Sequence, residues 1–179
     1  MKVLRKVIIV VVLIVVLFII IGLLLPSKAH VERSIKIAAP AEQVFPHVLD
    51  FRKWSSWSPW AERDPEMQLT FEGPQTGVGA KMIWASEHKQ VGSGSQETTE
   101  VQLNRLVRTH LDFGDQGVAD AFFELEPSSD GCTITWGLDS DLGINPIGRY
   151  FGLMFDSMIG PDYEKGLAKL KSVVESTTP

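Results

Sequence analysis

Residues 119–139 read ADAFFELEPSSDGCTITWGLD and carry the clearest structural pattern of the chain. Apolar and polar residues alternate on both sides of SSDG (128–131), which is typical of two half-buried β-strands joined by a tight turn. The apolar positions that share one face of this pair are Ala121, Phe123, Leu125, Cys132, Ile134, Trp136 and Leu138. The stretch therefore predicts an antiparallel hairpin with one face in a hydrophobic core.

The same alternation continues towards the N-terminus of this hairpin. Four earlier segments alternate in this way and are separated by glycine-rich or Asn-containing turns: 67–72, 80–87, 95–105 and 106–113. Residues 30–38, HVERSIKIA, add one more strand near the start of the domain. The six strands that short turns join in series predict an antiparallel meander, and the strand at 30–38 brings the sheet to seven strands.

Helical periodicity appears at two places outside the predicted strands. Residues 41–54, AEQVFPHVLDFRKW, fit two short helices, because a proline is tolerated only near the start of a helix. Residues 161–176, PDYEKGLAKLKSVVES, place Tyr163, Leu167, Leu170 and Val174 on one face of a long C-terminal helix. Before it, Asn145 and Pro146 predict the start of a helix that Gly160-Pro161 breaks or kinks.

The order of these elements, together with four stretches, resembles the START-like (SRPBCC) superfamily. The stretches are IKIAAPAEQVFPHVLDFRKWSSWSPW, GPQTGVGAKMIW, CTITWGL and GPDYEKGLAKLKSVVES, and the resemblance covers about residues 30–176. The most similar group is that of the polyketide cyclases/dehydrases and lipid-transport proteins. The resemblance implies an α+β helix-grip fold, in which a curved antiparallel sheet wraps round the C-terminal helix and an apolar ligand occupies the space between them. Because this superfamily hosts many activities, it implies no catalytic residue here.

An apolar segment precedes this domain. Val7–Leu25 contains no charge, and as a helix it spans roughly 28 Å, close to the thickness of a bilayer core. We expect a transmembrane signal anchor; a cleaved signal peptide is the alternative, although its apolar region is usually only about 7–15 residues long. The chain then divides into residues 1–29, with a cytoplasmic tip, anchor and linker, and residues 30–179, the ligand-binding domain.

The charge distribution bears on topology and on partners. Lys2, Arg5 and Lys6 before the apolar run favour a cytoplasmic N-terminus, which places the domain outside the cytoplasm, or in the periplasm of a Gram-negative cell. Residues 27–179 carry fourteen basic and twenty-two acidic residues, so we expect no nucleic-acid partner.

Motifs for common catalytic chemistry are not found in the sequence. The four histidines, His30, His47, His88 and His110, lack metal-binding spacing, and the only cysteine is Cys132. We therefore expect neither a metal nor another cofactor. Glu97 is a candidate acid or base if its strand face lines a cavity; the alternative is that it is exposed beside a turn.

Large aromatic and methionine side chains are common on the predicted inner faces. Such side chains form an adaptable apolar wall, although each is individually as consistent with an ordinary core. Thr99 and Thr109 are inward polar groups that would orient a ligand by hydrogen bonds. The full set of candidate cavity-lining residues is Trp57, Met82, Trp84, Glu97, Thr99, Thr109, Phe123, Trp136, Met154, Phe155 and Met158.

Trp57 belongs to WSSWSPW (54–60), where three tryptophans follow one another at intervals of three residues. Trp54 and Trp57 are expected to pack a short helix, ended by Pro59, onto the sheet, with contact to a membrane or a ligand portal as alternatives.

Three functions are compatible with the sequence. The first is an anchored domain that binds a lipid-like or polycyclic hydrophobic small molecule. The second is a non-catalytic domain that binds another envelope protein. The third is a cyclase- or dehydrase-type enzyme acting on an apolar substrate.

Overall fold

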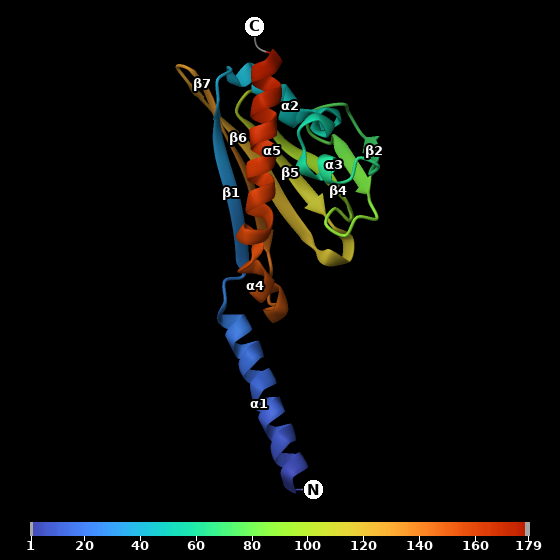
Figure 1. Ribbon diagram of the computed structural model, residues 1–179, viewed down its shortest axis with the longest axis vertical. Helices are drawn as coiled ribbons and strands as arrows, with labels where there is room; N and C mark the ends of the chain where they lie inside the picture. Colours follow the sequence, from blue (N-terminus) through green and yellow to red (C-terminus); the bar gives the residue numbers. More distant parts are fainter. Residues whose placement is uncertain (1, 178–179) are drawn as a thin grey trace.

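The protein contains a single antiparallel β-sheet wrapped round a long C-terminal helix, as the computed structural model of residues 2–177 shows (Figure 1). Over these residues the sheet has seven strands in the order β1-β7-β6-β5-β4-β3-β2. The strands are β1 (Lys28–Ile37), β2 (Gln68–Glu72), β3 (Lys81–Ala85), β4 (Ser93–Gln102), β5 (Leu106–Asp112), β6 (Val118–Ser128) and β7 (Gly131–Asp141). The predicted meander and the helix-grip fold are both confirmed. Strand β1 lies at one edge of the sheet and pairs with β7.

The helices lie at three levels along the long axis of the molecule (Figure 1). They are α1 (Lys2–Leu24), α2 (Ala41–Leu49), the 3₁₀ helix η1 (Phe51–Ser56), α3 (Pro59–Arg63), a short 3₁₀ turn η2 (Gly114–Gln116), α4 (Pro146–Gly152) and α5 (Phe155–Thr177). Where two short helices were expected after β1, three short pieces are present. Pro59 does not end a helix but occupies the first turn of α3, where its missing N–H costs no hydrogen bond.

Helix α5 supplies the hydrophobic stripe that the sheet grips. Tyr163, Leu167, Leu170 and Val174, the residues predicted for its inner face, are all buried. Their spacing of four, three and four residues keeps them on one side of the helix and against the concave face of the sheet. The sequence prediction for this helix face is therefore confirmed.

The break before α5 lies earlier than the sequence predicted. Asn145 caps α4, with its side-chain oxygen accepting hydrogen bonds from the backbone N–H groups of Ile147 and Gly148. However, α4 ends at Gly152, and α5 runs through Gly160 and Pro161 without interruption. Pro161 lies in the second turn of α5, so the helix continues there without the hydrogen bond that a backbone N–H at this position would donate to the carbonyl four residues earlier.

A β-bulge interrupts the pairing of β4 with β5. Thr98 pairs with Thr109 and Glu100 pairs with Arg108, so Thr99 is an extra residue without a partner. One extra residue reverses which side chains face the core, because the side-chain period of a strand is two. Before the bulge, Gln96 and Thr98 are therefore buried, whereas Glu97 and Thr99 are exposed.

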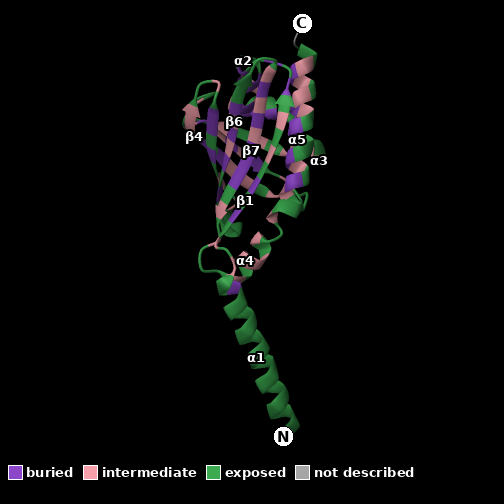
Figure 2. Ribbon diagram, turned by 90° about the vertical axis from the view of Figure 1, so that its left-hand side faces the viewer, coloured by how far each residue is buried: buried purple, intermediate pink, exposed green. Residues whose placement is uncertain are grey.

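Helix α1 extends away from the domain and is exposed along nearly its whole length (Figure 2). By length and composition it is apolar enough to cross a membrane. Gly22 is its one buried residue within the described part of the chain, because α4 packs against this end of the helix. Helix α1 and the domain therefore meet at α4.

Candidate functional site: an aromatic cavity between sheet and helix

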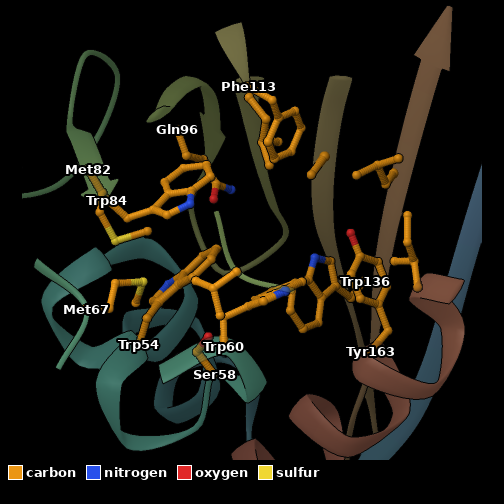
Figure 3. Close-up of a pocket in the computed structure, with 15 residues that line it drawn as sticks. Trp54, Ser58, Trp60, Met67, Met82, Trp84, Gln96, Phe113, Trp136 and Tyr163 are labelled. Carbon is orange, nitrogen blue, oxygen red and sulfur yellow. The ribbon is translucent and has the colours of Figure 1, made fainter. Parts of the chain in front are cut away.

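A cavity of about 140 Å³ lies between the concave face of the sheet, the first turns of α5 and the segment from η1 to α3 (Figure 3). Fifteen side chains line it, and nearly all of its surface is apolar. They are Trp54, Ser58, Trp60, Met67, Met82, Trp84, Val91, Gln96, Leu111, Phe113, Ala121, Trp136, Leu138, Ile159 and Tyr163. Apolar cavities of this size exclude water and bind a single aromatic ring, with roughly 150 Å³ as the known reference.

The WSSWSPW segment forms one wall of the cavity. The Asp50 side chain caps η1 by accepting a hydrogen bond from the backbone N–H of Arg52, which starts the helix that carries Trp54. The Trp54 indole N–H donates to the backbone oxygen of Val48 at 3.2 Å, which fixes the ring orientation. Three residues after Trp57, α3 then places Trp60 at the rim.

Trp57 lies behind this wall rather than in it. Its side chain is fully buried, and its indole N–H donates to the backbone oxygen of His47 at 3.1 Å. Its ring meets those of Trp54, Phe123 and Trp136, with centroids 5.0–6.0 Å apart. Edge-on packing of this kind stabilises each pair beyond its buried area, so Trp57 is core that holds the wall in place.

The opposite wall comes from the sheet and from α5. Trp136 on β7 stacks flat on Tyr163 of α5, and Trp84 on β3 meets Phe113 edge-on with centroids 5.8 Å apart. Figure 3 shows these rings, together with Met82 and Met67, turned toward the same space. Methionine side chains are flexible and polarizable, so this part of the wall can adjust to ligands of different shape.

One amide provides a polar position in this wall. Gln96 is buried, and its side-chain nitrogen donates to the hydroxyl of Thr109 at 2.8 Å. The Thr109 hydroxyl in turn donates to the backbone oxygen of Ala121 at 3.4 Å. With its nitrogen held in this way, the amide oxygen of Gln96 remains available as an acceptor, and a hydroxyl or N–H of a ligand is the matching group.

The remaining groups of the wall do not favour proton transfer near neutral pH. None of the fifteen lining residues carries a carboxyl, imidazole, amine or thiol group. Burial raises the pKa of the Tyr163 phenol well above its ordinary value, so this hydroxyl stays protonated. Among the described residues, no group of three or more His, Cys, Asp or Glu side chains has a geometry that could hold a metal ion.

Of the eleven residues proposed from sequence, the structure brings three to the cavity: Met82, Trp84 and Trp136. Phe123 and Trp57 are fully buried behind the wall, and Thr109 reaches the cavity only through Gln96.

Two predicted strand residues face solvent instead of the cavity. Glu97 and Thr99 are exposed, because the bulge at Thr99 reverses the alternation on which the prediction rested. Glu97 lies across the sheet from Lys81, with the charged groups 3.8 Å apart. A buried acid or base at this position is therefore excluded by the geometry.

Three predicted helix residues also lie outside the cavity wall. Met154 and Met158 are 50% and 57% exposed, and Phe155 is half-buried. The helix break at Leu153 turns this apolar face away from the sheet, which the periodicity alone did not reveal. Ile159, one residue further on, is the position of this segment that lines the cavity.

Sequence reasoning missed several lining residues. Tyr163 was predicted for the inner face of the C-terminal helix, and Trp60 was noted only as part of WSSWSPW; neither was proposed for the cavity, which both line. Gln96 was hidden by the bulge, since it sits one residue out of phase with the apolar positions later in its strand. The sequence shows only a run of polar residues from Gln96 to Thr99, and such runs are too common to identify a bulge.

The cavity lies at the end of the sheet from which α1 emerges. The strand pairings Lys28–Asp141, Asp120–Asp139 and Asp112–Val118 bring the start of β1 and the connection between β5 and β6 to one end. Val91, Phe113 and Ile159, which are half-buried rim residues, lie in connections or first turns at this same end. These half-buried residues of the cavity wall therefore lie at the same end of the sheet as the start of β1.

Comparisons with known proteins agree with this architecture. The chain is similar in fold to the crystal structure of protein CV1439 from Chromobacterium violaceum, with 19% identity, a TM-score of 0.55, and coverage of 82% of this chain and 97% of that one. It is also similar to NE0264 from Nitrosomonas europaea, with 12% identity, a TM-score of 0.60, and coverage of 84% and 96%. For SA2116 from Staphylococcus aureus, identity is 10%, the TM-score 0.63, and coverage 84% and 95%. At these identities the likeness concerns the fold alone.

No curated protein shows significant sequence similarity to the chain. The profile of one family, described as polyketide cyclase / dehydrase and lipid transport, matches residues 28–175, from the first residue of β1 almost to the end of α5. This match covers the whole sheet, the cavity and the gripping helix. The chain therefore belongs to the polyketide cyclase/dehydrase and lipid transport family.

Proposed function

We propose that the protein binds a hydrophobic small molecule, lipid-like or polycyclic, in the cavity between sheet and α5, and that α1 anchors it in a membrane. The observation that carries this proposal is the cavity itself: an aromatic, almost wholly apolar wall with one amide acceptor and no ionisable group of ordinary pKa. Such walls bind apolar ligands and use a few polar groups to orient them.

The size of the cavity limits how a ligand is held. At about 140 Å³ it encloses one ring or the end of a chain, whereas sites for drug-sized ligands are about 300–1,000 Å³. A larger molecule would place one end inside and extend through the rim, where Trp60, Met67 and Val91 are half-buried. The proposal therefore favours a ligand with one compact apolar end.

The anchor proposal rests on α1 and on how the domain begins. β1 starts at Lys28, and Ala29 is buried in its pairing with β7, so cleavage after Ala29 would remove residues that belong to the sheet. This supports an anchor that is retained. The three N-terminal positive charges support a cytoplasmic N-terminus and an extracytoplasmic domain.

Native mass spectrometry of the full chain purified from its membrane tests the ligand proposal. Ala121→Leu places a larger side chain into the cavity from the middle of β6, whereas Ala85→Leu makes the same change at an exposed position of β3. We expect a bound small molecule in the wild type and in the Ala85→Leu variant, and its loss in the Ala121→Leu variant.

The same adduct in all three proteins would show that the molecule binds elsewhere, for example as lipid around α1. No adduct in any of them, together with no binding of an added sterol and fatty-acid panel, would reject the proposal. Organic extraction of the wild-type complex then identifies the molecule.

A further inference from the structure

The segment between β7 and α5 presents a concentrated apolar surface, which we call the foot and define as residues 144–158. Of the nine large hydrophobic side chains exposed in the described chain outside α1, six belong to the foot. They are Ile144, Ile147, Phe151, Leu153, Met154 and Met158, and each is at least 50% exposed. Apolar residues gathered in this way on a surface mark an interaction site, whereas scattered ones do not.

The foot is joined to the end of α1 by specific contacts. The Arg149 guanidinium donates to the backbone oxygens of Leu23 and Leu25, which are among the carbonyls that a helix C-terminus leaves without partners. It also donates to the backbone oxygen of Gly143 at 2.6 and 2.9 Å, which ties α4 to the preceding loop. The foot and α1 are therefore fixed to each other.

An aromatic pair extends this joint along α1. The rings of Tyr150 and Phe18 stack with centroids 4.4 Å apart, and the Tyr150 hydroxyl donates to the backbone oxygen of Phe18 at 3.0 Å. Gly22 of α1 faces α4, and an added Cβ at this position would come within 2.7 Å of the Pro146 side chain. The small residue thus permits the close approach of the two helices.

These contacts define the depth of the foot relative to the apolar run. Phe18 precedes Leu25, the last residue of that run, by seven residues, which corresponds to about 10 Å along the helix axis. Helices that lie in a membrane interface bury their apolar faces about 5–10 Å into the boundary between headgroups and acyl chains. With α1 across a bilayer, α4 therefore lies at this boundary.

The charges of the foot are compatible with that position. Its charged residues are Arg149, whose guanidinium contacts the end of α1, and Asp156. The Asp156 carboxylate accepts two hydrogen bonds from the Arg33 guanidinium at 2.7 and 3.1 Å, and this contact lowers the pKa of Asp156. Both charged groups therefore have a partner within the protein. An interface with a charged protein would instead be expected to carry charged side chains at its rim that are available to the partner protein.

We propose that the foot is a second membrane contact, which lies in the leaflet where α1 ends and holds the mouth of the cavity toward lipid. This inference rests on the proposed anchor function of α1. The foot also adjoins the cavity wall along the chain, because exposed Met158 is followed directly by Ile159, which lines the cavity.

Site-specific fluorescence in nanodiscs tests this proposal with the full chain. The native Cys132 is fully buried, so single cysteines at Phe151 and Leu153 can carry an NBD label on the foot. Leu103→Cys is the matched control, because Leu103 is an apolar residue with 79% exposure at the opposite end of the sheet. Val15→Cys in α1 reports on the anchor alone.

We expect blue-shifted emission and quenching by doxyl-labelled phosphatidylcholine at positions 15, 151 and 153, and a water-like, unquenched signal at position 103. Quenching at position 15 with a water-like signal at 151 and 153 would overturn the foot and leave the anchor intact. Blue-shifted but unquenched foot labels would overturn it in favour of a protein partner or a second copy. An unquenched label at position 15 would reject the anchor, and the foot with it.

Discussion

The phenol ring of Tyr163 on α5 lies flat on the indole ring of Trp136 on β7, with centroids 3.9 Å apart and an interplanar angle of 9°. This pair joins the gripping helix to the sheet, and both rings also line the cavity. Stability and the proposed ligand binding therefore depend on the same contact.

Two substitutions of Tyr163 separate the contribution of the ring to stability from that of the hydroxyl. Tyr163→Leu should lower the free energy of unfolding by more than the roughly 0.5–1.5 kcal/mol that an aromatic pair adds beyond its buried area. Tyr163→Phe keeps the ring and should unfold at nearly the wild-type urea concentration, as followed by tryptophan fluorescence. Equal losses in the two variants would show that the hydroxyl, and not the stack, stabilises the joint.

Gly166 shows how closely α5 approaches this wall. A Cβ at this position would lie 2.9 Å from the Trp136 ring and 3.0 Å from Pro59. Gly→Ala in a helix normally gains up to about 1 kcal/mol, whereas overpacking a core costs about 1–3 kcal/mol. Because the neighbours are a buried ring and a proline, we expect Gly166→Ala to lower the midpoint of thermal unfolding. A rise in the midpoint would contradict the tight approach of helix and wall.

Gln96→Leu should change ligand preference more than stability. The variant removes the amide acceptor of the wall, and the Thr109 hydroxyl keeps its bond to Ala121. Phenol and toluene have the same number of non-hydrogen atoms, so the ratio of their affinities isolates the hydroxyl. We expect the variant to bind fluorinated phenol about two- to tenfold more weakly, as one neutral hydrogen bond implies, and fluorinated toluene at least as well as the wild type. Fluorine NMR of both proteins in the same nanodiscs measures this ratio; an unchanged ratio would place the polar contact elsewhere.

Trp57→Ala should be among the most damaging single substitutions in the domain. The side chain is fully buried, and removing a buried tryptophan typically costs about 3–5 kcal/mol. Trp57→Phe should be milder, since a smaller ring retains part of the contact with Phe123 and Trp136. Chemical unfolding of the three proteins checks this order. Retained stability with a loss of ligand binding alone would instead assign Trp57 to the cavity mouth.

Two histidines give stability contributions of opposite pH dependence. Burial, with a smaller effect of the Lys53 charge, lowers the pKa of His47. Below the ordinary pKa of about 6.5, the unfolded chain therefore takes up a proton more readily than the folded one, and stability falls as the solution is acidified. His47→Gln should reduce the drop in melting temperature between pH 7.5 and 5.5.

His30 is the control for this effect. The hydrogen bond that the His30 ring donates to the Asp139 carboxylate at 2.8 Å raises the pKa of His30, so its contribution is fully present below about pH 6.5 and disappears as the pH rises through the folded-state pKa. His30→Gln should therefore enlarge the drop on acidification. Changes of the same sign in both variants would reject these assignments.

The regular parts of the fold could be predicted from the sequence because each follows a strict period. The alternation in residues 119–139 predicted β6 and β7, and the spacing from Tyr163 to Val174 predicted the inner face of α5. Both elements bury one face only, and this makes their patterns readable.

The cavity could be predicted only in part, because its residues lie where the periods fail. Thr99 shifts the phase of β4 by one residue, so Glu97 is exposed, as the alternative prediction for it expected, and Gln96 was missed. In the foot, Met154 and Met158 follow helical spacing but face outward, since periodicity identifies an apolar face and not what covers it.

The connection between α1 and β1 limits how far the domain can act from its anchor. Only residues 25–27 separate the two elements, and the Ser27 carbonyl is held by the backbone N–H of Leu142 at 2.7 Å. A longer flexible linker would let a domain reach across an aqueous compartment, whereas this connection is too short and too well held for such movement. With α1 in a bilayer, the domain stays at a constant height above one leaflet, and any exchange of cargo with a second membrane requires another carrier to arrive there.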